Sequence, residues 1–346
     1  MSEKEKFISC QNLWKIYGPQ PEAFLRQNGG QPTDEQLTDT GHLAAVNDVS
    51  LDVYKGETLI VMGLSGSGKS TLLRCLSRLV EPTAGDITIE GRALRSMSKK
   101  ELIALRRTKM GMVFQHFALL PHKTVLENVM FPLEVQGVKR SERVSAAREL
   151  LKTVSLEGRD NHYPRQLSGG QQQRVGIARS LAVKPDIWFL DEPFSALDPL
   201  IRTEMQDEFI RLRETLGKTI MFITHDFDEA LRLADRIAIM NHGRVEQLDT
   251  PDQIVLHPAT EYIAKFTNNI AKSQFLTVEA LTEPFAPSDS TESFATDEEP
   301  LRKGERLASV ANRILNATKD ALPVVDEAGQ PFGMLHCKGA LQTLLE

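Results

Sequence analysis

The sequence predicts an α/β protein whose main sheet is parallel and carries helices on both faces. Short apolar runs alternate with helix-like stretches over most of the chain, and this alternation is typical of parallel sheets. The residues with the most distinctive chemistry come directly after those runs, at the strand ends where ligands bind in such sheets. A length of 346 residues with 41% hydrophobic content suits one large domain and a small one.

The first of these sites is a phosphate-binding loop. The apolar run Thr58–Met62 predicts a buried strand, and Ser70–Leu79 has helical spacing. Between them, GLSGSGKST fits the pattern G-x-x-x-x-G-K-[ST], whose backbone N–H groups surround phosphates at a helix N-terminus. Lys69 is expected to reach the β- and γ-phosphates, and the Ser70 hydroxyl to bind Mg²⁺. The candidate loop residues are Gly63, Ser65, Gly66, Ser67, Gly68, Lys69, Ser70 and Thr71.

Two adjacent carboxylates end a second apolar run, DIWFLDEP at residues 186–193. Asp191 is expected to hold Mg²⁺. Neighbouring side chains point to opposite sides of an extended chain, so we expect Glu192 to point away from Asp191. There Glu192 could orient or deprotonate an attacking water.

Two further polar residues follow predicted strands. His225 comes after Thr219–Thr224 and could hydrogen-bond the γ-phosphate and the attacking water. Gln115 ends Met110–Phe114 and could sense both Mg²⁺ and the γ-phosphate. We therefore count Glu192, His225 and Gln115 as candidate catalytic residues.

LSGGQQQR at residues 167–174 predicts a second phosphate-binding surface, because a glycine pair again opens a helix. Its candidate ligands are Ser168, Gly169, Gly170 and Gln171. One compact core cannot easily close both surfaces on one nucleotide, so we expect a site shared by two copies arranged head to tail. Asp198, in SALDP, is expected at the junction between the copies.

The N-terminal part predicts strands at Phe7–Tyr17 and Val46–Tyr54, separated by an insertion at 18–43 with two short helical pieces. The Tyr17 ring ends the first strand and could either stack on adenine or belong to the core. A helical subdomain is expected at about 116–166, and a hairpin at Arg236–Gln247.

The C-terminal part changes character. The first 272 residues form the predicted large domain, and 273–303 a partly disordered linker, because Glu283–Glu299 is rich in Pro, Ser, Thr and acids. Residues 304–346 predict a small α+β unit. It is expected to have a helix near Leu307–Leu315, a strand-turn-strand at Leu322–Leu335 and a helix at Gly339–Leu345.

Charge and composition exclude several classes of protein. The net charge of −6 argues against broad nucleic-acid binding. The sequence has no apolar run of about 18 residues and no apolar signal core at its start, so we expect a cytosolic protein without a transmembrane helix. The three cysteines have neither metal-site nor disulfide spacing.

Taken in order, GLSGSGKST, the Gln115 loop, LSGGQQQR, FLDEP, SALDP and ITHD resemble the ABC-transporter ATPase family over about residues 6–260. The resemblance implies a P-loop NTPase core with an antiparallel β subdomain, and ATP and Mg²⁺ as ligands. It also implies a homodimer of ATPase subunits that drives integral membrane permease subunits from the cytoplasmic face of the plasma membrane.

Within that family, three features are similar to the ATPase subunits of osmoprotectant importers. They are the insertion ending in TGHLAAVNDVSL, the run FSALDPLIRTEMQDE, and a tail, LPVVDEAGQPFGML, that resembles a CBS module. The resemblance implies import of glycine betaine, proline betaine or choline, which the sequence does not separate, with a substrate-binding protein as an indirect partner. CBS modules normally come as two repeats per chain, whereas only one is found here, so we expect it to pair with its counterpart in the dimer.

Two other readings compete with this one. A non-transport ABC protein acting on nucleic acid or ribosomes is disfavoured by the acidic charge and by the single ATPase core. An exporter ATPase is disfavoured by the importer-like insertion and tail.

Overall fold

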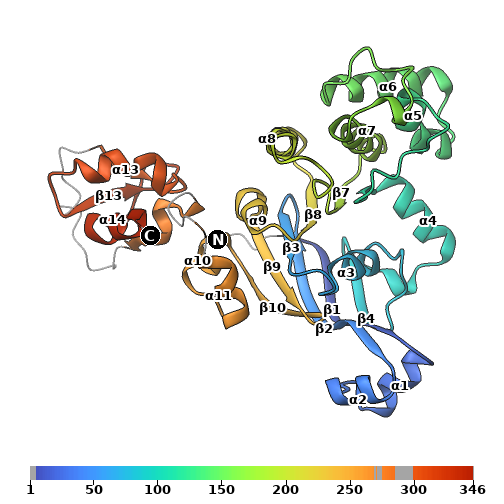
Figure 1. Cartoon of the computed structure of the whole chain (residues 1–346), viewed down its shortest axis with the longest axis horizontal. Coiled ribbons are helices and arrows are strands. Elements are labelled where there is room, and N and C mark those ends of the chain that lie inside the picture. Colours follow the sequence, from blue (N-terminus) through green and yellow to red (C-terminus); the bar gives the residue numbers. More distant parts are fainter. Residues whose placement is uncertain (1–4, 269, 271–274, 285–298, 346) are drawn as a thin grey trace. The chain divides into compact units, whose positions relative to one another are not determined.

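The computed structural model describes residues 5–268, 270, 275–284 and 299–345. It divides into two compact units, Met1–Leu248 and Asp249–Glu346 (Figure 1). Among the described residues, no helix combines the length and apolar character needed to cross a bilayer.

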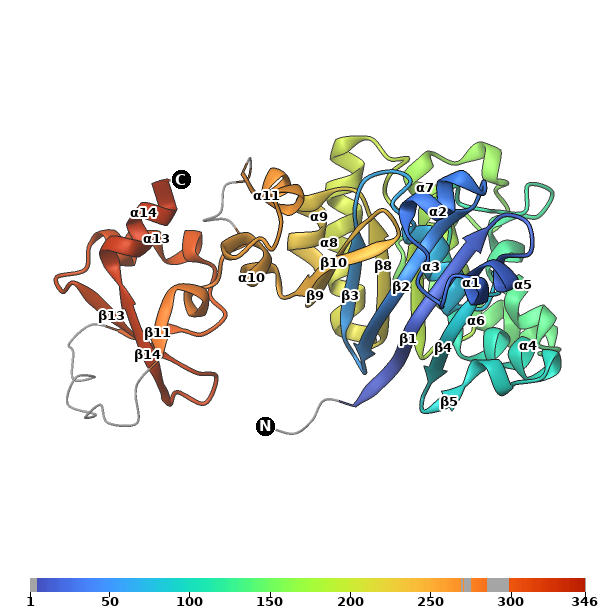
Figure 2. The ribbon, with the colours of Figure 1, turned by 90° about the horizontal axis from the view of Figure 1, so that it is seen from below.

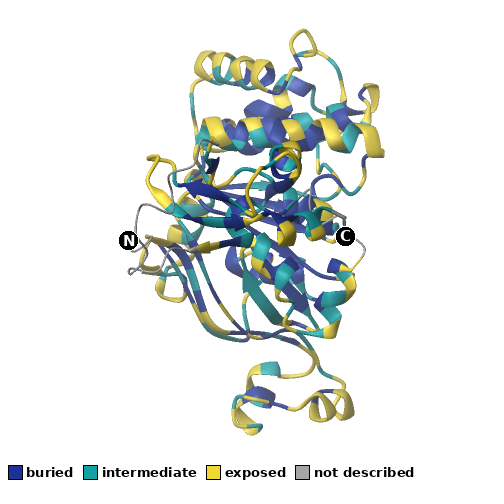
Figure 3. Ribbon diagram, turned by 90° about the vertical axis from the view of Figure 1, so that its left-hand side faces the viewer, coloured by how far each residue is buried: buried dark blue, intermediate teal, exposed yellow. Residues whose placement is uncertain are grey.

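A six-stranded sheet forms the centre of the first unit, in the order β10-β9-β3-β8-β7-β6. All pairings from β9 to β6 are parallel, as the alternation of strands and helices predicted. The strands are β3 (Thr58–Met62), β6 (Met110–Val113), β7 (Ile187–Asp191), β8 (Thr219–Thr224), β9 (Arg236–Asn241) and β10 (Arg244–Asp249). Every residue of β3, β7 and β8 is buried, as expected of strands covered on both faces (Figure 3).

A second, antiparallel sheet has the order β2-β1-β4-β5. Its strands are β1 (Lys6–Tyr17), β2 (Leu43–Tyr54), β4 (Ala84–Ile89) and β5 (Arg92–Ala93). The predicted insertion lies between β1 and β2 and holds α1 (Pro21–Gln27) and α2 (Asp34–Asp39). These helices bury Phe24, Leu25 and Leu37 against Trp14 and Ile16 of β1, in a small cluster of their own.

Helix α3 (Lys69–Leu76) lies between the two sheets, because it contacts β1 and β2 on one side and β7 and β8 on the other (Figure 2). Leu72, Leu73, Cys75 and Leu76 are fully buried in the main core. Burial of four apolar side chains stabilises this helix by several kcal/mol, at about 1.5–3 kcal/mol for a fully buried large residue. The helix that follows the phosphate loop is therefore held firmly at its base.

A helical region follows β6. Its helices α5, α6 and α7 contact one another, and α7 also contacts β6 and α8. The helices of the first unit after α3 are η1 (Leu94–Ser96), α4 (Lys99–Thr108), α5 (Val125–Val135), α6 (Arg140–Thr153), η2 (Pro164–Gln166), α7 (Gly169–Leu181), α8 (Pro199–Leu216) and α9 (Phe227–Leu233). Ser98 and Glu101 form a capping box at the start of α4, a helix that the sequence analysis did not predict.

The second unit contains a sheet with the order β11-β14-β13-β12. Its elements are α10 (Pro251–Leu256), α11 (Glu261–Thr267), η3 (Val278–Leu281), β11 (Thr282–Pro284), β12 (Leu301–Arg302), α13 (Leu307–Leu315), β13 (Ala321–Val325), β14 (Pro331–His336) and α14 (Cys337–Leu345). The elements expected after residue 304 lie close to their predicted positions.

The predicted linker at 273–303 differs from the structure. Leu276, Val278 and Leu301 are fully buried in the second unit, and the short strands β11 and β12 belong to its sheet. These segments are too short for a periodic pattern, and neighbouring strands supply their burial. The remainder of the expected disorder, 285–298, lies outside the described residues.

The expected boundary after residue 272 also differs, since the division falls after Leu248. Asp252, in the first turn of α10, accepts hydrogen bonds from the backbone N–H of Thr277 at 3.1 Å and from its hydroxyl at 2.9 Å. These contacts tie α10 to the part of the chain that leads into the third sheet.

Candidate active site

The carboxyl edge of the parallel sheet carries a cavity of about 570 Å³. The residues around it come from the loop after β3, the segments after β6, β7 and β8, and the ends of β1 and β2. They are Tyr17, Leu43, Ala45, Leu64, Ser65, Gly66, Gly68, Lys69, Ser70, Thr71, Gln115, Glu192 and His225. Most residues predicted for the site thus meet at one place, although they are far apart in the sequence.

The phosphate loop requires glycine at two positions. A Cβ on Gly63, where φ is 150°, would lie 2.2 Å from the carbonyl oxygen of Met240. A Cβ on Gly68, where φ is 101°, would lie 2.0 Å from the carbonyl oxygen of Ala45. Both positions therefore exclude other side chains by contact and by backbone conformation.

Lys69 is 5% exposed, and its ammonium donates hydrogen bonds to the carbonyl oxygens of Gly63 at 2.8 Å and Leu64 at 3.0 Å. Burial lowers the pKa of Lys69, and the carboxylates of Glu192 and Asp191 oppose that effect. The ammonium is thus held beneath the loop, with its charge only partly compensated by Glu192 at 4.0 Å.

Asp191 ends β7 and is 2% exposed. Its Oδ1 accepts a hydrogen bond from the Ser70 hydroxyl at 2.7 Å, and its Oδ2 lies 3.4 Å from Nη2 of Arg74. The sequence analysis missed Arg74, which lies four residues after Ser70 on α3 and hence on the same helix face.

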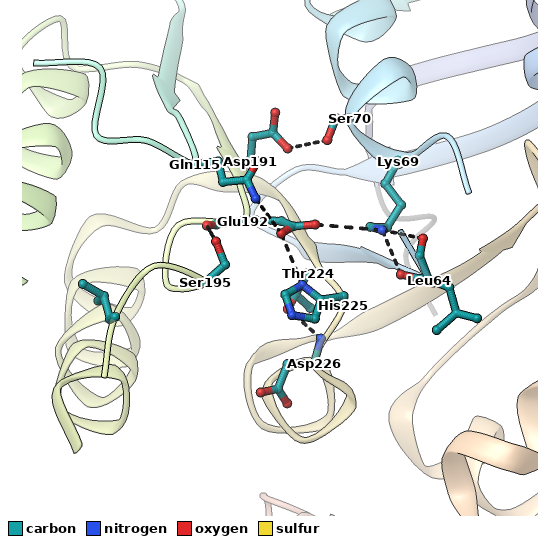
Figure 4. A network of polar contacts seen from close by, with 12 residues as sticks. Leu64, Lys69, Ser70, Gln115, Asp191, Glu192, Ser195, Thr224, His225 and Asp226 are labelled. Atoms are coloured by element: carbon teal, nitrogen blue, oxygen red, sulfur yellow. Dashed lines mark hydrogen bonds and ion pairs between the residues drawn. The ribbon is translucent and has the colours of Figure 1, made fainter. Parts of the chain in front are cut away.

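Glu192 is the centre of a polar cluster (Figure 4). Its Oε2 accepts a hydrogen bond from Nε2 of Gln115 at 3.1 Å and lies 3.2 Å from Nδ1 of His225. The hydroxyl of Ser195, also missed from the sequence, donates to the Glu192 carbonyl at 3.0 Å.

The prediction of an extended backbone at Glu192 is wrong. Its φ is 46°, in the left-handed region, so the strand ends at Asp191 and the chain turns. This turn directs the Glu192 carboxylate toward Lys69, Gln115 and His225, and not simply away from Asp191. A non-glycine residue in this conformation costs about 1–2 kcal/mol, which the surrounding contacts must offset.

Tyr17 lies at the rim of the cavity with 45% of its surface exposed, so it is not a core residue. Lys15 Nζ lies 5.0 Å from the centre of its ring. Leu43 and Leu64, which the sequence analysis did not single out, are also exposed at this rim, by 65% and 56%. An exposed aromatic ring beside apolar side chains can take a flat, apolar ligand group.

The LSGGQQQR segment does not line this cavity. Ser168 is the exposed N-cap of α7, and its hydroxyl accepts a hydrogen bond from the N–H of Gln171 at 3.3 Å. A Cβ on Gly170 would lie 2.6 Å from Cγ2 of Ile201, so α7 and α8 pack closely here. Asp198, the exposed N-cap of α8, lies at the start of that neighbouring helix.

Taken together, the cavity has the groups that phosphoryl transfer needs. A glycine loop and an ammonium can neutralise phosphate charge, and two adjacent oxygen donors, Ser70 and Asp191, suit a hard divalent cation. A carboxylate held between an amide and an imidazole can position a water.

Comparison with known proteins agrees with this chemistry. A family model described as ABC transporter matches residues 46–195. The chain is 55% identical over 340 residues to the trimethylamine N-oxide transport system ATP-binding protein TmoW of Ruegeria pomeroyi, covering 98% of this chain and 97% of that protein. It is 51% identical over 278 residues to the glycine betaine transport ATP-binding protein OpuAA of Bacillus subtilis, covering 80% of this chain and 66% of that protein.

A solved structure is also similar, the dimeric post-hydrolysis state of the ATP-binding cassette MJ0796 bound to ADP and Pi. The TM-score is 0.60 at 36% identity, covering 70% of this chain and 98% of that one. With such identity to TmoW over nearly its whole length, this chain belongs to the ATP-hydrolysing, ATP-binding subunits of ABC transporters.

Proposed function

We propose that the chain is the ATPase subunit of an importer for small methylated amines, working as a head-to-tail homodimer beneath two permease subunits. It would act as a peripheral protein at the cytoplasmic face of the membrane, and a substrate-binding protein would deliver the solute. The observation that carries the catalytic part is the convergence of Lys69, Gln115 and His225 on Glu192.

In this proposal the loop amides and Lys69 bind the β- and γ-phosphates of ATP, and the exposed Tyr17 ring stacks on adenine. Ser70, Asp191 and Gln115 would hold Mg²⁺, which would supply charge neutralisation on the phosphate oxygens. Glu192 would orient a water and accept its proton, while His225 would donate a hydrogen bond to the γ-phosphate.

The segment Ser168–Gln171 would complete the site of the other copy. Its glycines and helix N-terminus are suited to phosphate, yet they lie outside the cavity of their own chain. Asp198 begins the neighbouring helix and would lie at the same junction.

A mixing experiment tests this shared site. Lys69→Ala and Ser168→Ala are each expected to inactivate hydrolysis. A heterodimer of the two variants would have one site with both defects and one intact site. Random exchange should therefore restore about a quarter of the wild-type rate, because half of the dimers keep one of two sites. A chain carrying both substitutions, mixed with wild type, is the control. Its heterodimers have no intact site, so only the quarter of dimers that are wild-type homodimers should hydrolyse ATP, whereas sites contained within single chains would leave about half of the wild-type rate.

No recovery in mixtures of the single variants, with subunit exchange shown by a tagged copy, would contradict the shared site. Such a failure would not affect the proposed catalytic role of Glu192, because Glu192 lines the cavity of its own chain and can be tested by its own substitution.

The permease would dock beside the Gln115 loop. An apolar groove of about 370 Å³ lies there, with Phe114, Ala118, Leu120 and Phe131 among its lining residues. Arg179 fastens the loop by donating to the carbonyl oxygens of Ala118 at 2.7 Å and Phe117 at 3.2 Å. Leu119 belongs to the same loop, between the lining residues Ala118 and Leu120. Leu119→Asp should abolish transport while leaving the basal ATPase rate, and loss of both together would argue against a coupling role.

The transported solute is proposed from the relatives. The alignment with the trimethylamine N-oxide protein covers 98% of the chain and hence includes the tail, whereas that with the glycine betaine protein covers 80%. Trimethylamine N-oxide and glycine betaine share a methylated cationic nitrogen and an anionic oxygen, so one class of aromatic cage in the partner proteins can bind either.

Uptake of labelled trimethylamine N-oxide, in cells expressing the complete transporter, tests this assignment. Uptake should fall to background with Glu192→Gln, and unlabelled trimethylamine N-oxide should compete better than glycine betaine, proline betaine or choline. Stronger competition by one of the other three would name a betaine or choline importer, and outward transport would indicate an exporter.

We further propose that residues 304–346 of the second unit form a single CBS-like unit and that this unit pairs with its counterpart in the dimer. A chain ending at Lys272 would lack the whole third sheet. If that shortened chain dimerised and responded to ionic strength and nucleotides as the full chain does, the pairing would be refuted.

A further inference from the structure

A buried polar network lies behind the turn that carries His225. The turn joins β8 to α9, and its backbone is held by the Thr224 hydroxyl, which accepts a hydrogen bond from the N–H of Asp226 at 3.0 Å. Asp226 in turn caps α9, because its Oδ1 accepts from the N–H of Glu229 at 3.0 Å. His225 itself is exposed and makes its contact on the other side of the turn, with Glu192.

Glu229 is the buried member of this network, with 4% of its surface exposed. Its carboxylate accepts hydrogen bonds from Nε2 of Gln206, at 3.0 Å, and from the hydroxyl of Thr224. Burial raises the pKa of Glu229 to about 7, and Asp226 adds to that rise, while the hydrogen bonds and Arg202 oppose it. The Glu229 carboxyl group thus changes its charge near neutral pH, where enzymes usually work.

The other charged groups around Glu229 come from α8 and from its own helix. On α8, Nη1 of Arg202 lies 3.4 Å from Oδ2 of Asp226. On α9, Nη1 of Arg232 donates to Oε1 of Gln206 at 3.2 Å and also pairs with Asp207 of α8. Arg202 and Gln206 lie one and two turns into α8, the helix that begins after Asp198. The network therefore joins the His225 turn to the helix that follows Asp198.

We propose that Glu229 is a positioning residue for His225, and that its ionised form holds the β8–α9 turn in register with α8. Ionised Glu229 accepts a hydrogen bond from the Thr224 hydroxyl. The oxygen of that hydroxyl can then accept a hydrogen bond from the backbone N–H of Asp226. Protonation removes the negative charge of Glu229 and turns one of its oxygens into a hydroxyl. The hydrogen bonds that it accepts from Thr224 and Gln206 then become weaker, because they are no longer charge-assisted, and the turn is held less firmly.

This inference rests on the proposed role of His225 in hydrolysis. It predicts that the turnover rate falls as Glu229 takes up its proton, whereas ATP binding does not change, because the phosphate loop is not part of the network. A merely structural residue would lower stability without a selective change in kcat or in its pH dependence.

The test uses the full chain, with kcat and KM for ATP measured from pH 6 to pH 8.5. Glu229→Gln keeps the shape and stays neutral, so at pH 8 it should lower kcat by about three- to tenfold and leave KM within about twofold. It should also remove the component of the wild-type kcat profile that titrates near pH 7. Asp228→Asn is the matched control, because it removes an exposed carboxylate one residue away, and it should keep the wild-type profile.

His225→Ala separates failure of this inference from failure of the proposed function. If that variant keeps the wild-type kcat, the role of His225 falls and Glu229 falls with it. If it is inactive while folded Glu229→Gln shows wild-type kcat and pH profile, only the inference on Glu229 is overturned. Should Glu229→Gln not fold, Gln206→Leu removes the donor from α8, and an unchanged kcat in that variant would overturn the inference in the same way.

Discussion

The phosphate loop and the LSGGQQQR segment both place glycines beside a helix N-terminus, but their surroundings differ. The loop encloses a buried lysine and faces side chains from the segments after β6, β7 and β8 across a cavity. The second segment leaves Ser168 exposed, and its glycines pack toward α8 without facing that cavity. The loop therefore has its polar partners within the chain, whereas the LSGGQQQR segment has only its packing support there.

The loop and the LSGGQQQR segment should therefore respond differently to mutation. Changes around the loop should alter nucleotide binding or chemistry in every copy. Changes at the second surface should spare binding by a single copy and appear only when two copies close on the nucleotide. Ser168 is the most informative residue for this comparison, because its structural role as the N-cap of α7 can be measured separately from any effect on hydrolysis.

The largest effect is expected for Glu192→Gln. Removal of a general base lowers kcat by about 10²–10⁴-fold, while Lys69 and the loop still bind ATP, so ATP-bound dimers should accumulate. Single-turnover hydrolysis and size-exclusion chromatography with ATP measure both effects. Glu149→Gln, an exposed change on α6, should behave as wild type, and normal steady-state hydrolysis by Glu192→Gln would refute its role.

Ser168→Ala should separate binding from hydrolysis. Loss of the N-cap lowers the free energy of unfolding by about 1 kcal/mol, and loss of a hydrogen-bond donor to phosphate should lower kcat by about 10²-fold. ATP binding by the monomer, measured by fluorescence titration, should be unchanged. If kcat falls no further than the fraction of unfolded protein explains, Ser168 serves only as a helix cap.

Gly68→Ala, in contrast to Ser168→Ala, should weaken ATP binding by the monomer. The added Cβ would lie 2.0 Å from the carbonyl oxygen of Ala45, at a φ of 101°, and the loop must shift to relieve that contact. We expect at least about tenfold weaker ATP binding by the monomer, measured by the same titration. Gly66→Ala is a useful comparison: its φ of 83° is also in the left-handed region, but the added methyl group would meet no atom within 4 Å, so a difference between the two variants isolates the contact with Ala45. Equal affinities of Gly68→Ala and wild type would show that the loop conformation does not limit binding.

At Glu229 we expect a change in the free energy of unfolding that depends on pH. Its pKa is raised from 4.5 to about 7, so folding takes up a proton within that window, and the free energy of unfolding falls as the pH rises through it. Glu229→Gln lacks this proton uptake. It should match wild type only below about pH 4 and exceed it by about 1–3 kcal/mol at pH 8, in urea unfolding at each pH. A difference that does not grow with pH would contradict the raised pKa.

Much of the fold could be predicted because its signals are local. The apolar runs of β3, β7 and β8, the insertion helices and the stop of α8 at Gly217 follow from periodicity and backbone preference. Helix α4 was missed although Ser98 and Glu101 carry a capping signal, because none of its residues is fully buried and its apolar periodicity is weak. The short strands β11 and β12 could not be predicted, since their burial depends on strands distant in the sequence.

Residue type and spacing are enough to identify the candidate chemistry of this protein: the glycine loop proposed to bind phosphate, the paired carboxylates and the second glycine segment. The geometry of these groups follows from tertiary contacts. The left-handed turn at Glu192, the approach of Arg74 to Asp191 and the burial of Glu229 against α8 depend on contacts between segments that are far apart in the sequence. The physical reason is that side-chain direction, desolvation and charge pairing are set by neighbours in space, and a linear pattern does not contain them.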